Sequence, residues 1–227
     1  HIIDYSSKKW KIKSRNKEQD FALNLLMDPK VNIITLIGPA GTGKTMIALY
    51  AGLCQAVDDW HTVIPKQAQY SRLIVTRPIQ PMGKDIGYLP GTLEEKMSPW
   101  VAPINDNLQF LLGNGRDSLK EYVAEGIIEI EALTYIRGRS INNAFIVVDE
   151  IQNMTAHELK TVVTRVGDNS KIVLMGDIEQ IDNVYIDETT NGLTHAVEKF
   201  KEHDIAGHIT LTRGERSKVA TLAAKIL

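Results

Sequence analysis

Short apolar runs alternate with amphipathic stretches along most of this chain of 227 residues. Apolar, mostly β-branched residues dominate 31–37, 73–76, 144–148 and 171–175, as in strands that are buried on both faces of a parallel sheet. The stretches between them carry apolar residues at helical spacing, and Thr155 with Glu158 forms a capping box. We therefore expect strands at 9–13, 31–37, 73–76, 127–130, 144–148, 171–175 and 208–212, and helices at 16–27, 46–57, 93–112, 117–124, 155–166, 191–201 and 215–227.

Strands that alternate with helices predict an α/β fold, in which helices cover both faces of a parallel sheet. The helical segment at about 93–125 interrupts the alternation, and we expect it to be an insertion at one edge. Residues 77–91 contain three prolines and three glycines, which excludes a regular helix or a central strand. A loop of this length in a compact domain usually has a function.

Composition indicates one globular domain over 1–227, with 43% hydrophobic residues, 24% charged residues and a net charge of −2. No apolar run approaches the roughly 20 residues that span a bilayer, so we expect no membrane association. A single cysteine, Cys54, excludes an internal disulfide and fits a reducing cytoplasm. The chain begins at His1 without a methionine, so we expect the C-terminal fragment of a longer chain.

The motif that organises the chain lies between the run at 33–37 and the helix at 46–57. A glycine-rich turn between a strand and a helix is a phosphate-binding loop, because its backbone N–H groups and the helix N-terminus face the phosphates. In such a loop the lysine reaches the β- and γ-phosphates of ATP, and the last hydroxyl binds Mg²⁺. The residues are Gly38, Pro39, Ala40, Gly41, Thr42, Gly43, Lys44 and Thr45.

Two further strand ends carry polar residues suited to nucleotide hydrolysis. Asp149 follows a buried run and is expected to hold Mg²⁺ through its water shell. Glu150 is the candidate base that polarises the attacking water. Gly176 and Asp177 end the next run, and Gln180 has a donor and an acceptor that can bridge the water and the γ-phosphate.

The order of these motifs resembles the first motor core of superfamily-1 helicases. The resemblance covers Asn16-x-x-Gln19, the phosphate loop, Thr76-Arg77-Pro78, the D-E-x-Q box at 149–152 and the G-D-x-x-Q box at 176–180. It implies a RecA-like P-loop NTPase fold. It also implies that Gln19, with Asn16 nearby, binds the adenine of ATP.

A narrower resemblance is to the PhoH family of cytosolic ATPases. It rests on PxxPMGKDIGYLPG at 78–91, EKM at 95–97, RGRSI at 137–141 and LTxGERS at 211–217. It implies Mg²⁺-dependent ATP hydrolysis coupled to RNA, a hexameric ring, and a PIN nuclease domain upstream of His1 in the parent chain. No acidic cluster of the PIN type is present in this sequence.

Arg216 matches the helicase arginine that reaches the γ-phosphate from a second motor domain, and Arg213 is the alternative. Only eleven residues follow Arg216, so we expect no second motor domain after it. The arginine acts either within its own subunit or on the ATP of a neighbour in a ring, which is the arrangement that the resemblance implies. The alternative is that Arg216 forms an ordinary surface salt bridge with Glu215 or another acidic residue.

Single-stranded RNA is the expected partner. Cations in loops near strand ends suit phosphate contacts, and a tyrosine there can stack on a base. Solvated surface charge is the alternative for each cation. The candidates are Arg77, Lys84, Tyr88, Arg137 and Arg139.

Three functions remain open from the sequence. The leading one is an ATPase that translocates on RNA or unwinds it. The second is an ATP-gated oligomeric scaffold that regulates an attached PIN ribonuclease domain without unwinding. The third, a small-molecule kinase, gives no reason for the G-D-x-x-Q box.

Overall fold

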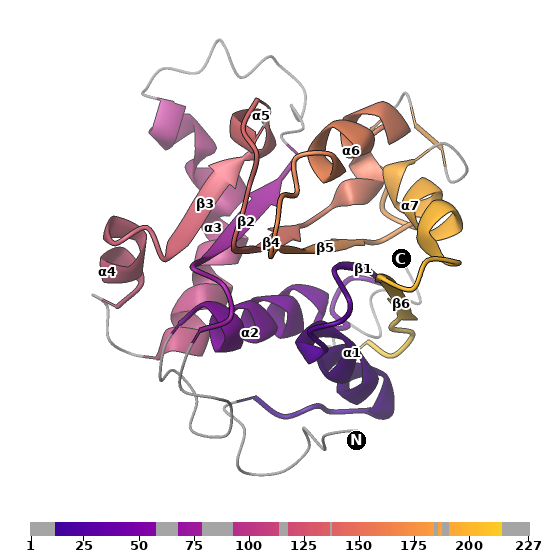
Figure 1. The fold of residues 1–227 in the computed structure, drawn as a ribbon, viewed down its shortest axis with the longest axis horizontal. Coiled ribbons are helices and arrows are strands. Elements are labelled where there is room, and N and C mark those ends of the chain that lie inside the picture. Colours follow the sequence, from indigo (N-terminus) through magenta and orange to yellow (C-terminus); the bar gives the residue numbers. More distant parts are fainter. Residues whose placement is uncertain are drawn as a thin grey trace, which may run out of the picture.

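The computed structural model describes residues 12–57, 68–78, 93–113, 118–136, 138–183, 186–187 and 191–214. Six parallel strands form one sheet in the order β3-β2-β4-β5-β1-β6 (Figure 1). The strands are β1 (Ile33–Ile37), β2 (Arg72–Arg77), β3 (Ile128–Ala132), β4 (Ala144–Val148), β5 (Lys171–Gly176) and β6 (Ala206–Thr210).

Helices cover both faces of the sheet, because alternate strand side chains point in opposite directions. On β4, Phe145 and Val147 belong to one buried cluster, whereas Ile146 and Val148 belong to the other. The first cluster includes residues of α1 (Lys17–Met27), α2 (Lys44–Ala56), α3 (Leu93–Leu112) and α4 (Ser118–Ala124). The second includes residues of α5 (Leu133–Ile136), the 3-10 helix η2 (Ile151–Asn153), α6 (Ala156–Val163) and α7 (Gly192–Phe200). This is the architecture of a RecA-like P-loop NTPase, as expected.

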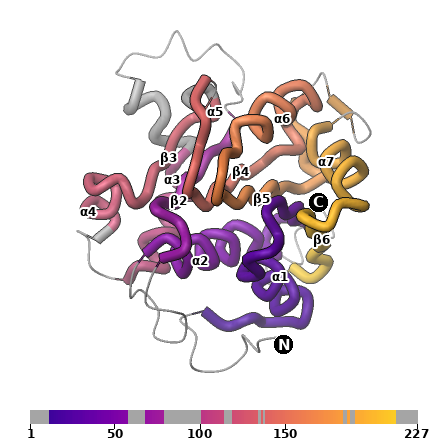
Figure 2. Tube along the Cα trace, in the orientation of Figure 1, coloured from indigo at the N-terminus to yellow at the C-terminus, as the bar shows by residue number. Residues whose placement is uncertain are grey.

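Helices α3 and α4 come between β2 and β3 in the chain, and α4 lies beside β3, the strand at one edge of the sheet (Figure 2). At the opposite edge, β6 lies beside α1 (Figure 2). Within the described residues, none of the helices combines the length and the apolar character that a membrane span requires.

Several boundaries differ from the expected ones. Strand β6 covers 206–210 instead of 208–212, because β1 pairs with the weakly apolar residues Ala206 and Gly207. Helix α6 ends at Val163, three residues early, and neither α5 nor η2 was expected. The expected helix at 215–227 lies outside the described residues, as does most of the strand at 9–13, whose described residues, Ile12 and Lys13, are not in a strand.

A buried lysine connects α1 to the sheet. Lys171, the first residue of β5, has no exposed surface. Its Nζ donates hydrogen bonds of 2.7 Å to the carbonyl oxygens of Leu26 and Asp28, at the C-terminal end of α1. Burial lowers the pKa of Lys171 to about 8, although the negative charge of Asp28 acts to raise it.

This lowered pKa predicts a stability that depends on pH. Between pH 8 and 10.5 the unfolded chain binds more protons at residue 171 than the folded chain, so this group makes the free energy of unfolding rise with pH. In that window the wild type should gain on the order of 2 kcal/mol relative to Lys171→Met. Urea unfolding at pH 7 to 10 measures the difference, with exposed Lys30→Met as the control. A difference that does not change with pH would contradict the prediction.

Candidate nucleotide site

The phosphate loop joins β1 to α2 in the expected strand–turn–helix setting. Gly41 and Gly43 have φ angles of 83° and 88°, a left-handed conformation that favours glycine. Gly43 is the N-cap of α2, so the first N–H groups of this helix face the same space. Lys44 is 8% exposed. Its Nζ donates to the carbonyl oxygens of Gly38 and Pro39, the latter at 3.1 Å.

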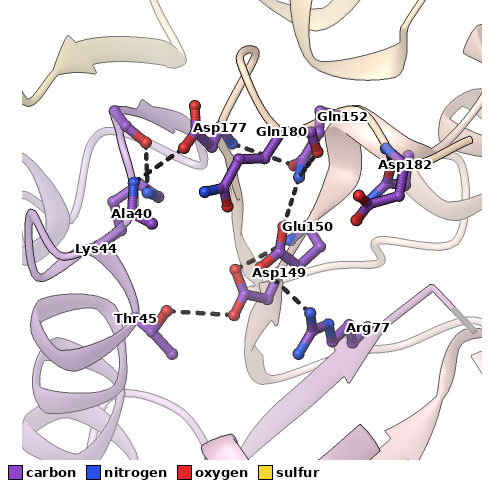
Figure 3. Close-up of polar contacts among 12 residues, drawn as sticks. Ala40, Lys44, Thr45, Arg77, Asp149, Glu150, Gln152, Asp177, Gln180 and Asp182 are labelled. Atoms are coloured by element: carbon purple, nitrogen blue, oxygen red, sulfur yellow. Dashed lines mark hydrogen bonds and ion pairs between the residues drawn. The ribbon is translucent and has the colours of Figure 1, made fainter. Parts of the chain in front are cut away.

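The two candidate magnesium ligands are in contact. The Thr45 hydroxyl donates to Asp149 Oδ2 at 3.2 Å (Figure 3). Burial and the negative charge of Glu150 raise the pKa of Asp149 to about 6, while Arg77 and Lys44 act in the opposite direction. A bound divalent cation would stabilise the charged form of this buried carboxylate. Hydroxyl and carboxylate oxygens are the donors that Mg²⁺ prefers, so these residues fit the ion.

Glu150 is held in a strained backbone conformation with both carboxylate oxygens engaged. Its φ angle is 59°, in the left-handed region, where Asn143 and Asn169 are the other non-glycine residues in the described chain. Asparagine tolerates that region, whereas glutamate seldom adopts it. Gln152 Nε2 donates to Glu150 Oε2, and Arg77 Nη2 lies 3.3 Å from Glu150 Oε1 (Figure 3). Arg77, a candidate RNA contact, is therefore an ion-pair partner of the candidate base.

A buried glutamine connects the two acidic loops. Gln152 Nε2 also donates to the carbonyl oxygen of Gln180 at 3.0 Å, and its Oε1 accepts from the Asp177 N–H at 3.2 Å. Asp177 Oδ2 in turn accepts from the N–H of Ala40 at 2.9 Å (Figure 3). A chain of hydrogen bonds thus runs from Glu150 through Gln152 and Asp177 to the phosphate loop.

These loops surround a cavity of about 250 Å³, and Gln180 lies at its wall. The wall also includes Asn107 of α3, which we did not predict and whose Nδ2 donates to the Pro103 carbonyl oxygen at 2.7 Å. The amphipathic pattern of α3 does not distinguish Asn107 from other polar positions. The remaining lining residues are Ala40, Gly41, Gly43, Lys44, Thr45, Met46, Asp149, Glu150 and Asp177.

The candidate adenine residues lie at the start of α1. Asn16 is the N-cap, and its Oδ1 accepts from the Gln19 N–H at 2.9 Å. The Gln19 side chain donates to the Thr42 carbonyl oxygen at 2.8 Å and accepts from the Arg15 N–H at 2.9 Å. Gln19 therefore supports the phosphate loop directly, and its contact with adenine stays a prediction.

The other predicted residues are spread over the chain. Arg139 Nη2 forms ion pairs with Glu129 and Glu131 of β3, at 3.0 and 2.7 Å. Arg213 follows β6 and is exposed. The four remaining candidates, Lys84, Tyr88, Arg137 and Arg216, lie outside the described residues. Contacts with RNA stay a prediction for Arg77, Lys84, Tyr88, Arg137 and Arg139, and the contact of Arg216 or Arg213 with the γ-phosphate stays a prediction as well.

The first glycine of the phosphate loop is required by packing. Leu211 N donates to the Ile37 carbonyl oxygen at 2.7 Å, which extends the pairing of β6 with β1. A Cβ atom on Gly38 would lie 2.3 Å from the Leu211 carbonyl oxygen. The residues after β6 thus pass directly over the start of the phosphate loop.

Comparisons with known proteins match almost the whole chain. A protein-family model described as "PhoH-like protein" matches residues 11–226. Protein PhoH2 of Bacillus subtilis (strain 168) is 52% identical over 220 residues, which are 96% of this chain and 48% of that protein. Protein PhoH2 of Mycolicibacterium smegmatis is 39% identical over 95% of this chain and 47% of its own length. The chain spans about half the length of these curated relatives.

Among solved structures, the crystal structure of Pif1 helicase from Candida albicans aligns with a TM-score of 0.44 and 16% identity. The alignment covers 94% of this chain and 43% of that helicase.

The crossing of Leu211 over Gly38 predicts a sharp difference between two glycines. Gly38→Ala should lower the free energy of unfolding by ~1–3 kcal/mol, because the new methyl group meets backbone that cannot rotate away. Gly214→Ala is the control, since a Cβ at Gly214 meets nothing within 4 Å. Chemical denaturation measures both, and equal stabilities for the two variants would show that the crossing is not close in solution.

Proposed function

The chain belongs to the PhoH-like protein family, and on this premise we propose that it hydrolyses ATP with Mg²⁺ and couples hydrolysis to RNA binding, translocation or unwinding. The observation that carries the proposal is the contact of Thr45 with Asp149, with Glu150 beside them at the mouth of the phosphate loop. The nucleotide-binding lysine, a candidate metal pair and a candidate base then share one cavity. That combination is suited to phosphoryl transfer to water.

Each side chain has a specific role in this proposal. Lys44 leaves the loop carbonyls to contact the β- and γ-phosphates, and the N–H groups at the start of α2 contact the phosphate oxygens. Thr45 and Asp149 hold Mg²⁺, which when bound neutralises charge on the β- and γ-phosphates. Glu150, oriented by Arg77 and Gln152, accepts a proton from the water that attacks the γ-phosphorus, and ADP leaves with the bridging oxygen. Gln180 orients that water.

The proposal extends to assembly and location. A homo-hexameric ring supplies Arg216, or Arg213, to the ATP of a neighbouring subunit, where it stabilises the charge of the transition state. Single-stranded RNA runs along loops that carry Arg77, Lys84, Tyr88, Arg137 and Arg139. The parent chain carries a PIN nuclease domain. A cytoplasmic location is supported by the lone free cysteine, Cys54, which is buried.

One observation favours a second candidate function. The curated relatives are about twice as long as this chain, so ATP binding can serve a domain that lies outside it. In that case the protein is an ATP-gated oligomeric scaffold that regulates an attached ribonuclease domain. Unwinding of an RNA duplex with ATP favours the first function, whereas an ATP-dependent change of oligomer size without unwinding favours the second.

Two substitutions test the hydrolytic site. Glu150→Gln should lower kcat for ATP by ~10²–10⁴-fold while ATP still binds, because glutamine keeps the size of the side chain but cannot accept the proton. Lys44→Ala should remove both turnover and tight ATP binding. Phosphate release with and without single-stranded RNA measures turnover, and Glu198→Gln, an exposed carboxylate paired with Lys201, is the control. Full turnover in a folded Glu150→Gln variant would exclude this base.

Mixing of inactive subunits tests the arginine. Arg216→Ala and Lys44→Ala are each expected to be inactive, but a mixture should regain ATPase activity, since an intact site then meets an intact arginine at some interfaces. Repeating the mixture with Arg213→Ala in place of Arg216→Ala shows which of the two arginines acts on the neighbouring subunit. A mixture that stays inactive while hexamers exchange subunits would place the arginine within its own subunit.

A further inference from the structure

A carboxylate outside the predicted site joins α1 to the residues that follow β6. Glu18 lies in the first turn of α1. Its Oε2 accepts hydrogen bonds from the backbone N–H groups of Thr212 at 2.7 Å and Arg213 at 3.2 Å, and its Oε1 accepts from the Thr212 hydroxyl. One side chain thus satisfies two successive backbone donors and a hydroxyl.

Stabilising the start of a helix does not require an acidic residue to make contacts as distant as those of Glu18. Asp20 also lies in the first turn, where any carboxylate stabilises a helix N-terminus. Asp20 accepts from the Ser14 hydroxyl at 3.2 Å, whereas Glu18 reaches a segment 194 residues away. Hydrogen bonds from Thr212 and the nearby charge of Arg213 lower the pKa of Glu18, so the carboxylate is charged at neutral pH.

The segment that Glu18 holds lies against the phosphate loop. Leu211 is bonded to Ile37 and packs on Gly38, as described above. The neighbour of Glu18 in sequence, Gln19, donates to the Thr42 carbonyl oxygen in the same loop. A single turn of α1 therefore holds both the phosphate loop and the backbone that leads to Arg213.

We propose that Glu18 is a positioning residue for ATP hydrolysis: it fixes the backbone at Thr212 and Arg213, and so sets where the arginine charge after β6 meets the γ-phosphate. This inference rests on the proposed function. It predicts that Glu18 contributes to turnover and little to ATP affinity, because an arginine of this kind acts on charge that develops in the transition state.

The test compares Glu18→Ala with Asp20→Ala, its matched control from the same helical turn. Glu18→Ala should lower kcat for ATP by about 10–100-fold, since small displacements of a catalytic group have effects of that size. The affinity for ATP, measured with a non-hydrolysable analogue, and the thermal midpoint should stay close to those of the wild type. Glu18→Gln, which keeps one neutral acceptor, should recover part of the activity.

Hydrogen exchange gives a readout that does not depend on turnover. The amides of Thr212 and Arg213 should exchange faster in Glu18→Ala than in Asp20→Ala, whether or not ATP is present. Thr212→Val, which removes the hydroxyl donor, should lower kcat by less when Glu18 is already alanine than in the wild type.

Three outcomes would overturn the inference. If the wild type hydrolyses ATP and Glu18→Ala does so equally well, the contact positions nothing that turnover uses. If Glu18→Ala loses activity only in proportion to its loss of folded protein, or Asp20→Ala loses as much, the role is structural. If the wild type binds ATP without hydrolysing it, the proposed function fails and the inference fails with it.

Discussion

The parallel pairing of β1 with β5 is the constraint on which the nucleotide site depends. Ile37 pairs with Gly176 at the ends of these strands, and Gly38 N donates to the Gly176 carbonyl oxygen at 3.2 Å. Ala40, two residues after Gly38, and Asp177, the residue after Gly176, can then form their hydrogen bond. A register shift of one residue would turn every side chain of β1 to the other face and separate these groups. Gly176 is needed as well, because a Cβ there would lie 2.1 Å from Gln152 Oε1.

Much of this arrangement follows from local sequence. The buried strands and the phosphate loop were predicted correctly because strong apolar runs and glycine-rich turns act over a few residues. The position of Asp149 and Glu150 beside this loop follows for a related reason, since parallel strands bring their carboxyl ends to one edge of the sheet. The short helix α5 and the true bounds of β6 were missed. An edge strand that is half exposed needs no continuous apolar run, so Ala206 and Gly207 carried no signal.

Side-chain partners could not be predicted, because they depend on which distant segments the fold brings together. Arg77 was expected to face RNA, and its described partner is Glu150. Arg139 had the same expectation, yet it lies between two glutamates of β3. Glu18 and Asn107 belong to no motif that the sequence reveals. Glu18 nevertheless contacts residues after β6, and Asn107 lines the nucleotide cavity. The sequence shows which loops carry arginine or lysine, but only the tertiary structure shows which acidic residues pair with them.

The left-handed backbone at Glu150 has a consequence for engineering this protein. A non-glycine residue in that conformation costs on the order of 1–3 kcal/mol, and glycine would relieve the cost while removing the carboxylate. Under the proposed function, the residue that would relieve this backbone cost at position 150 is thus a residue that cannot assist hydrolysis. Variants selected for heat resistance alone would drift towards inactive chains at this position. Selection for a thermostable form should therefore keep residue 150 fixed and seek its gains elsewhere in the sheet.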